Sequence, residues 1–277
     1  MKTIRGKKIL VCGKGGSGKS TLVALMANFF QEIGYKTLVV DGDASNPEGQ
    51  LRLLCGRAVQ DAPKPLIEFF GGIDAVSCPV DDPSPLTRIN DTVPVPEKRI
   101  DIEKEIPQEY YVTDRGICLF QAGKIETYGQ GCDGPIEKVV RDFLVQGDWV
   151  NLIDMKAGIE FFGRKIPDTA DIILVVLDPT WESLAIAKRL DSFCRASEMA
   201  TYWFILNKID SPEMDALMMK KLDELHSKVL GSVSFDPKLA KKELEGGQLI
   251  RGELHNDVEH IVRTLELFLS SSEIDFL

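Results

Sequence analysis

Short apolar runs alternate with amphipathic stretches along most of the chain. Runs of strand length predict β-strands over residues 8–12, 36–41, 116–121, 149–154, 171–177, 202–206 and 229–235. Apolar positions at helical spacing predict helices over residues 21–31, 47–54, 136–145, 181–197, 212–227, 238–244 and 258–269. Strands that alternate with helices indicate an α/β fold, in which a mostly parallel sheet is flanked by helices on both faces.

One stretch breaks this alternation. Residues from about 61 to 108 are rich in proline and charge, and we expect short helices and turns there, such as one over 66–70. The sequence shows no internal repeat and no long linker. We therefore predict one domain over residues 1–277, with an irregular insertion at about 61–108.

The charge balance restricts the partners. With 43 acidic and 33 basic residues, the formal net charge is −10, which argues against a nucleic-acid or polybasic membrane surface. The apolar runs are too short for a bilayer span, and the N-terminus leads directly into the first strand. The tail around residues 270–273 is not a basic amphipathic anchor, so we expect a cytoplasmic protein. Its scattered cysteines should mostly be reduced.

A phosphate-binding loop follows the first predicted strand. The segment from Gly13 to Thr21 fits the pattern G-x-x-x-x-G-K-[ST] and leads into the first helix. Its residues are Gly13, Lys14, Gly15, Gly16, Ser17, Gly18, Lys19, Ser20 and Thr21. Glycines let backbone N–H groups converge on an anion, and the helix N-terminus favours negative charge. Lys19 is expected to neutralise the β- and γ-phosphates, and the Ser20 hydroxyl to bind Mg²⁺.

Carboxylates follow two other strands. Asp41 and Asp43 come at the end of the second strand, and Asp154 ends the strand at 149–154. Ligands of an open α/β sheet bind at the carboxyl ends of its strands, and Mg²⁺ prefers oxygen ligands. Ser20, Asp41 and Asp154 are therefore the predicted magnesium residues.

The strand at 202–206 is followed by Asn207-Lys208-Ile209-Asp210. Asn207 and Lys208 are predicted to contact the nucleotide. The string also fits N-K-x-D, in which an aspartate reads guanine, so these residues leave ATP and GTP both open.

The early lysine of the loop, Lys14, adds a resemblance. The pattern G-K-G-G-x-G-K-[ST]-T resembles the deviant P-loop of the family that includes nitrogenase iron protein, the MinD/ParA ATPases and the arsenite-pump ATPases. This resemblance implies a SIMIBI-like P-loop NTPase fold and a homodimer that binds ATP/ADP with Mg²⁺. It implies that Lys14 reaches the partner's nucleotide and acts in catalysis, with Asn207 packing on adenine.

The resemblance extends to the acids. The segment Asp154-Met155-Lys156-Ala157-Gly158-Ile159-Glu160 resembles the D-x-x-A-G-I-E of MinD-like proteins, where the aspartate belongs to Walker B. Asp43 resembles the aspartate that orients the attacking water, which makes it the second predicted catalytic residue. Asp41 would then support the metal indirectly. The implied activity is hydrolysis of ATP to ADP and phosphate.

A glycine-rich segment around Cys132 gives a more specific resemblance. Residues 123–135 are similar to a segment of the nickel-insertion ATPases of carbon monoxide dehydrogenase (the CooC type), which carries C-x-C at a dimer interface. Here Gly134 stands in place of the second cysteine. Cys132 is the predicted ligand of Ni²⁺ or Zn²⁺, and with one thiolate per chain the site would need Asp133 or other cysteines.

The leading hypothesis is a CooC-type ATPase that assists assembly of a metal centre, with a client such as carbon monoxide dehydrogenase. A variant of it acts on the client without carrying metal. The alternatives are an iron–sulfur electron donor like nitrogenase reductase, a MinD/ParA-type positioning ATPase and a GTPase metallochaperone. The single suitable cysteine counts against the electron donor, and the acidic charge counts against binding to DNA or membrane.

Overall fold

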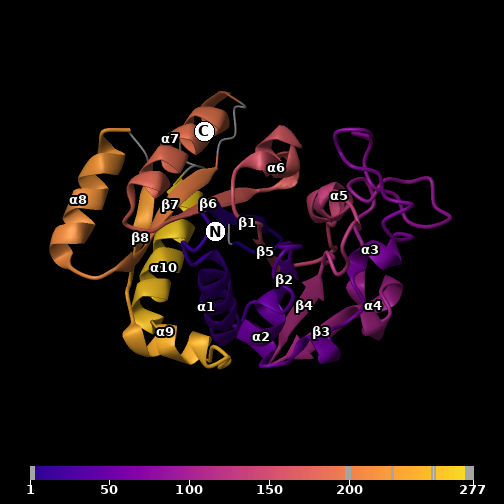
Figure 1. Cartoon of the computed structure of the whole chain (residues 1–277), viewed down its shortest axis with the longest axis horizontal. Helices are drawn as coiled ribbons and strands as arrows, with labels where there is room; N and C mark the ends of the chain where they lie inside the picture. Colours follow the sequence, from indigo (N-terminus) through magenta and orange to yellow (C-terminus); the bar gives the residue numbers. More distant parts are fainter. Residues whose placement is uncertain (1–3, 197–200, 226–227, 251, 253, 272–277) are drawn as a thin grey trace.

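The protein is built on an eight-stranded sheet (Figure 1). The computed structural model describes residues 4–196, 201–225, 228–250, 252 and 254–271. The strand order is β3-β4-β2-β5-β1-β6-β7-β8, and all neighbours pair in parallel except β3 and β4. The strands are β1 (Lys8–Gly13), β2 (Thr37–Asp41), β3 (Tyr111–Asp114), β4 (Ile117–Gln121), β5 (Val150–Asp154), β6 (Ile172–Leu177), β7 (Tyr202–Ile209) and β8 (Val229–Ser234).

Helices cover both faces of this sheet, as Figure 1 shows. One face carries α1 (Lys19–Glu32), α2 (Gly49–Cys55), α9 (Pro237–Leu244) and α10 (His255–Ser271). The other carries α3 (Leu66–Phe69), α4 (Ile102–Glu105), α5 (Gly134–Asp142), α6 (Glu160–Gly163), α7 (Trp181–Ala196) and α8 (Pro212–Asp223). The predicted fold class is confirmed. Among the described residues, no helix has the length and apolarity needed to span a membrane.

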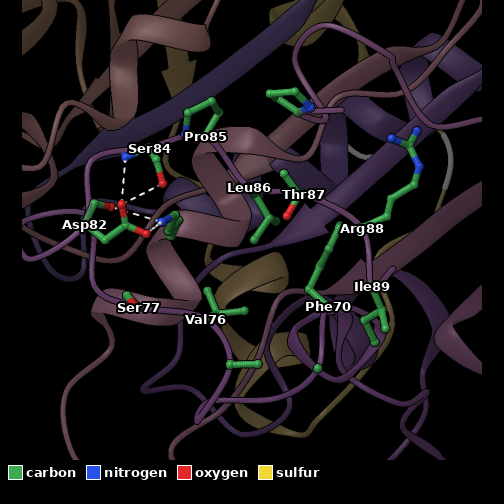
Figure 2. A pocket seen from close by; sticks show the side chains of 14 residues that line it. Phe70, Val76, Ser77, Asp82, Ser84, Pro85, Leu86, Thr87, Arg88 and Ile89 are labelled. Atoms are coloured by element: carbon green, nitrogen blue, oxygen red, sulfur yellow. Dashed lines mark hydrogen bonds and ion pairs between the residues drawn. The ribbon is translucent and has the colours of Figure 1, made fainter. Parts of the chain in front are cut away.

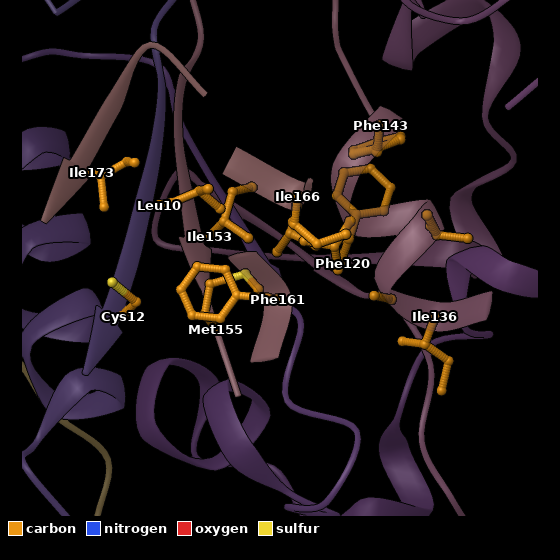
Figure 3. Packing of buried hydrophobic residues seen from close by; sticks show 14 of the residues in the cluster. Leu10, Cys12, Phe120, Ile136, Phe143, Ile153, Met155, Phe161, Ile166 and Ile173 are labelled. Carbon is orange, nitrogen blue, oxygen red and sulfur yellow. The ribbon is translucent and has the colours of Figure 1, made fainter. Parts of the chain in front are cut away.

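Side chains of the central strands point alternately to the two faces of the sheet and so contribute to two hydrophobic cores. In β1, Leu10 and Cys12 pack on the face of α5 and α7, whereas Ile9 and Val11 pack on the face of α1. Figure 3 shows Leu10 and Cys12 beside Phe161 of α6 in the first of these cores. Because every residue of β1 is buried, its sequence is continuously apolar from Ile9 to Cys12 rather than alternating.

The insertion contains short helices and turns, as expected. It includes α3 and α4 and follows a 3₁₀ turn at Val59–Asp61, and its irregular loops lie beside α5 in Figure 1. The sequence did not predict β3, an antiparallel edge strand with one buried residue. Such a strand has almost no apolar alternation to read.

The helix predicted over 136–145 is wrong at its end. It begins at Gly134 and stops at Asp142, because the backbone beyond turns extended at Phe143. There Ile100 N donates to Leu144 O at 2.9 Å, and Gln146 N donates to Ile100 O at 2.8 Å. The insertion thus pairs through Ile100 with the backbone of residues 144–146, as in a sheet, and this pairing replaces the end of the predicted helix. The predicted ends at residues 197 and 227, and the tail from 272, lie outside the described residues.

Candidate functional site

The phosphate loop joins β1 to α1 with a backbone that only glycine accommodates easily. Gly18 precedes α1 with a φ of +92°, and a Cβ there would lie 2.1 Å from Asn207 Nδ2. Gly13 has a φ of +143°, and its Cβ would lie 2.3 Å from Val176 O on β6. Both positions require positive φ and close backbone approach, which explains the glycines. Gly15 and Gly16 are exposed at the top of the loop.

Lys19 and Ser17 lie inside this loop. Lys19 Nζ donates to Lys14 O at 2.9 Å, so the ammonium group lies inside the loop and is hydrogen-bonded to its backbone. Burial lowers the pKa of Lys19, and the Asp154 and Asp43 carboxylates oppose that shift. Ser17 Oγ is buried with no hydrogen-bond partner among the described residues. A cation and an orphaned hydroxyl within a ring of glycines form a cradle for a polyphosphate.

Asp41 is fully buried and paired with a lysine that belongs to no sequence motif of fixed spacing. Asp41 Oδ1 lies 2.9 Å from Lys124 Nζ, and Oδ2 accepts from Gln50 N at 3.0 Å. Burial raises the pKa of Asp41 even against the lysine. Gly49 is required here, since a Cβ would lie 2.2 Å from Asp41 Oδ2. Asp41 is thus positioned by its neighbours, consistent with an indirect role.

Asp154 lies directly across from Asp41, because the two are paired in the register of β2 and β5. Its Oδ2 accepts from Gln50 Nε2 at 2.8 Å, while Oδ1 is buried without a partner among the described residues. Burial raises the pKa of Asp154 to about 7, and the Asp41 charge adds to the rise. A buried carboxylate oxygen that lacks a partner favours a cation ligand.

The two predicted catalytic residues flank this centre. Asp43 Oδ1 accepts from Ser45 N at 2.9 Å and from Ser45 Oγ at 2.6 Å, so Asp43 is turned toward its own loop. Lys14 Nζ lies 3.0 Å from Asp178 Oδ2 and donates to Thr180 Oγ1 at 3.0 Å. In the isolated chain, therefore, Lys14 is engaged by the segment after β6.

Asn207 and Lys208 fasten the end of β7 to the phosphate loop. Asn207 Nδ2 donates to Ser17 O at 2.8 Å, and Lys208 Nζ donates to Gly16 O at 2.7 Å. Beside them is a pocket lined by Thr21, Leu22, Leu25, Asn207, Lys208, Ser234, Phe235, Asp236, Leu239, Ala240, Glu243 and Leu254. Its apolar walls suit a planar base. Asp210 is exposed and does not line this pocket.

The cysteine loop, residues 122–133, runs from the end of β4 to α5. At its start, Lys124 Nζ donates to Asp43 O at 2.7 Å and Ile125 N donates to Ala44 O at 3.0 Å. At its end, both oxygens of Asp133 are paired, with Lys156 and Arg164. Burial alone would raise the pKa of Asp133, yet these two cations hold it below its ordinary value. Asp133 is therefore occupied, and Cys132 is exposed.

Gln50 and Lys124 are the site residues that sequence reasoning missed. Gln50 is fully buried and joins Asp41, Asp154 and the Ser20 carbonyl, to which Nε2 donates at 2.8 Å. Lys124 comes shortly after the carboxyl end of a strand, a position that only weakly indicates a residue of the ligand-binding edge of the sheet. Neither belongs to a motif with fixed spacing, so only the fold reveals their partners.

These residues fit a nucleotide with Mg²⁺. The glycine cradle and Lys19 match the phosphates, and the unpartnered Oδ1 of Asp154 lies at the same edge of the sheet as Ser20. Oxygen atoms are the ligands that Mg²⁺ accepts. Within the described residues, no group of three or more His, Cys, Asp or Glu side chains could hold a metal ion by itself.

Comparison with known proteins agrees with this geometry. Residues 8–250 match the family model of the CobQ/CobB/MinD/ParA nucleotide-binding domain. An uncharacterised ATP-binding protein of Methanocaldococcus jannaschii is 33% identical over 262 residues, covering 93% of this chain and 99% of the relative. The carbon monoxide dehydrogenase accessory protein CooC of Rhodospirillum rubrum is 29% identical over 233 residues, covering 83% of this chain and 84% of CooC.

Solved structures support the fold. The cell division ATPase MinD of Pyrococcus furiosus superposes with a TM-score of 0.62 at 18% identity, covering 95% of this chain and 99% of MinD. A ParA family ATPase of Chlorobium tepidum gives a TM-score of 0.61 at 17% identity, covering 95% of this chain and 99% of its own. At these identities the likeness concerns the fold.

Proposed function

The chain belongs to the CobQ/CobB/MinD/ParA nucleotide-binding family, and from this premise we propose that it is an ATP-hydrolysing dimeric switch that assists assembly of a metal centre in a client enzyme. The client class that fits best is carbon monoxide dehydrogenase or a related nickel enzyme. The support is the similarity to CooC, which extends over most of both chains.

The observation that carries this proposal is the attachment of the cysteine loop. Its start is fastened to Asp41 and to the backbone of Asp43 and Ala44 through Lys124 and Ile125. Its end is fastened through Asp133 to Lys156, two residues beyond Asp154. A change at either strand end therefore acts directly on the segment that carries Cys132. Such an attachment suits a switch that couples nucleotide state to a surface loop.

The nucleotide residues take the following roles in the proposal. The backbone from Gly13 to Gly18 surrounds the phosphates, Lys19 neutralises their charge, and Ser20 with Asp154 holds Mg²⁺. The metal, when bound, withdraws charge from the phosphate oxygens. Asn207 and Lys208 support the loop from below, and the adjacent pocket takes the base. We favour adenine, because Asp210 does not line that pocket.

Hydrolysis then proceeds by addition of water to the γ-phosphorus. The bond to the β–γ bridging oxygen breaks, which yields ADP and inorganic phosphate. Asp43 first releases its hydrogen bonds to Ser45 and then orients the water. Lys14 of a second copy stabilises the charge that develops on the γ-phosphate oxygens. Lys14 is available for this only after it separates from Asp178.

A MinD/ParA-type positioning ATPase is the second candidate. The similarity of the fold to MinD and ParA structures favours it. The net charge of −10 weighs against its attachment to DNA or to an anionic membrane.

Co-production with a nickel-dependent carbon monoxide dehydrogenase tests the proposed function. Nickel per client molecule is measured with the wild-type chain, without it and with Lys14→Gln. We expect the nickel content to rise only with the wild-type chain. A nickel content that is equal in all three preparations contradicts the proposed role with this client.

A further inference from the structure

Two cysteines that are distant in the sequence meet at the first turn of α5. A Cβ on Gly134 would lie 2.5 Å from Cys78 Sγ and 3.4 Å from Cys132 Sγ. The two sulfurs are therefore separated by no more than the sum of these distances. The space that a side chain at position 134 would fill is already occupied by the Cys78 thiol, which comes from the insertion.

The turn that carries Cys78 is fixed to α5. Cys78 O accepts from Asp81 N at 3.0 Å and from Asp82 N at 2.9 Å. Asp82 Oδ2 in turn lies 2.8 Å from Nζ of the buried Lys138, one turn along α5 from Gly134. Figure 2 shows Asp82 on this turn, with its hydrogen bonds to Ser84. The position of Cys78 is thus determined by the same helix that begins beside Cys132.

Cys132 is held differently. It is exposed, and it follows Gly131, where a Cβ would meet nothing within 4 Å. The next residue, Asp133, is anchored by Lys156 and Arg164. One thiol is therefore fixed and half-buried, while the other sits on an open glycine turn that can adjust the separation of the two sulfurs.

We propose that Cys78 and Cys132 together form a thiolate pair that binds a soft or borderline divalent cation of the Zn²⁺, Co²⁺ or Ni²⁺ type. Each thiol loses its proton on binding, and the two sulfurs become ligands. Asp133 is excluded as a ligand by its two ion pairs. A second copy of the chain supplies the other two thiolates of a four-coordinate site, and this step rests on the dimer of the proposed function.

Cobalt binding to the full-length, reduced protein tests the pair. Co²⁺ is titrated under anaerobic conditions with ATP and Mg²⁺ present, and thiolate-to-metal charge-transfer absorption is recorded. We expect saturation at one Co²⁺ per two chains, and loss of the charge-transfer band in both Cys78→Ser and Cys132→Ser. Cys55→Ser, which alters another partly buried thiol, should retain it. An unchanged band in Cys78→Ser overturns the proposal.

The space shared by position 134 and Cys78 allows a rescue. Gly134→Ala alone should weaken Co²⁺ binding, because the new methyl group displaces the Cys78 thiol. The double variant Cys78→Ser with Gly134→Cys should restore the band, since the thiol returns to the same space. Failure of this rescue in a protein whose thermal unfolding is unchanged contradicts the assignment.

ATP hydrolysis is measured in parallel for every variant. Loss of the cobalt band with normal hydrolysis shows that the substitution removes a metal ligand and leaves the nucleotide site intact, as expected for the thiol pair. A wild-type protein that hydrolyses ATP and gives no band overturns the metal site and leaves the ATPase intact. A protein that gives the band without hydrolysing ATP supports the thiol pair and contradicts the proposed switch.

Discussion

Lys14 is held by Asp178 of its own chain, with Nζ 3.0 Å from Oδ2 and both side chains largely buried. The same carboxylate accepts hydrogen bonds from Thr180 and Ser183 through Oδ1, so it is fixed in place. If Lys14 serves the nucleotide of a second copy, it must first leave this partner. In the proposed dimer, the ion pair would therefore oppose dimer formation.

Asp178→Asn should make nucleotide-dependent dimerisation easier. The amide keeps the Oδ1 acceptor but removes the charge that faces Lys14. One such ion pair is worth up to about 1 kcal/mol, and dimerisation breaks one pair in each copy. Its removal therefore corresponds to up to about a thirtyfold lower protein concentration at half-dimerisation. Sedimentation velocity with ATP and Mg²⁺ measures this midpoint. Glu182→Gln, which alters a more distant and exposed neighbour of Lys14, is the control and should have little effect. Weaker dimerisation of Asp178→Asn would show that the pair supports the dimer.

Lys14→Gln should bind ATP normally and lose hydrolysis. The Lys14 side chain pairs with Asp178 and Thr180, and Lys19 holds the Lys14 backbone carbonyl, which glutamine retains, so the loop should keep its shape. A cation supplied to the transferring phosphate contributes about a thousandfold or more to the rate. Phosphate release under saturating ATP measures the loss, with Lys104→Gln as an exposed control on α4. Turnover within twofold of wild type would falsify the catalytic role of Lys14.

Local motifs explain what could be predicted. The phosphate loop and the strand-end acids follow from short patterns whose spacing the fold preserves, so Lys19, Asp41 and Asp154 converge as expected. Gln50 and Lys124 reach the strand-end acids, Asp178 reaches Lys14, and Cys78 reaches the cysteine loop, each from another element. Their roles depend on the register between strands and on the path of the insertion, which no local pattern encodes.

The edge strand β3 and the end of α5 show the same limit. Tyr111–Asp114 has too few buried positions to produce an alternating pattern. Beyond Asp142 the apolar residues still follow helical spacing, but the backbone there forms hydrogen bonds with Ile100 of the insertion instead of continuing the helix. In both places pairing with a segment distant in the sequence decides the structure.

The raised pKa of Asp154 predicts a pH dependence of magnesium binding. With a pKa of about 7, the carboxyl of the ligand-free protein is largely protonated below neutral pH and must lose this proton to bind a cation. Affinity for Mg²⁺ with ATP should therefore rise with pH and level off above about pH 8, approaching tenfold per unit on the acidic side. Isothermal titration across this range measures the affinity. Asp154→Asn should bind more weakly and keep only the shallower slope that comes from protonation of ATP itself.

The same proton affects folding stability in the absence of ligand. The pKa of Asp154 is higher in the folded chain than its ordinary value of 3.8, so the folded state binds the proton more tightly than the unfolded state. This contribution is complete below pH 3.8 and is lost progressively as pH rises from 3.8 to about 7. The difference in unfolding free energy between Asp154→Asn and the wild type should therefore grow in favour of the variant over this interval. A constant difference would contradict the raised pKa.

Gly18→Ala should weaken ATP binding, in addition to the loss of stability that backbone strain at this position causes. The methyl group would strike Asn207 Nδ2 and detach it from Ser17 O, in addition to the strain of a φ of +92°. We expect ATP affinity to fall about tenfold or more. Gly34→Ala is the matched control, because its φ is +87° and its Cβ would meet nothing within 4 Å. It should cost about 1 kcal/mol of stability and leave ATP affinity unchanged.

Lys124→Met should be strongly destabilising, because it leaves the Asp41 carboxylate buried without its cation. Lys124 is 7% exposed and Asp41 is fully buried, and breaking such a pair costs about 3 kcal/mol or more. Urea denaturation should show the loss, and the double variant Asp41→Asn with Lys124→Met should recover part of it, since no unpaired charge remains. If the single and the double variant unfold at the same urea concentration, the loss of stability comes from the packing of the Lys124 side chain and not from its charge. Recovery in the double variant would establish that the start of the cysteine loop is fastened to the nucleotide site by an ion pair, the connection on which the proposed switch depends.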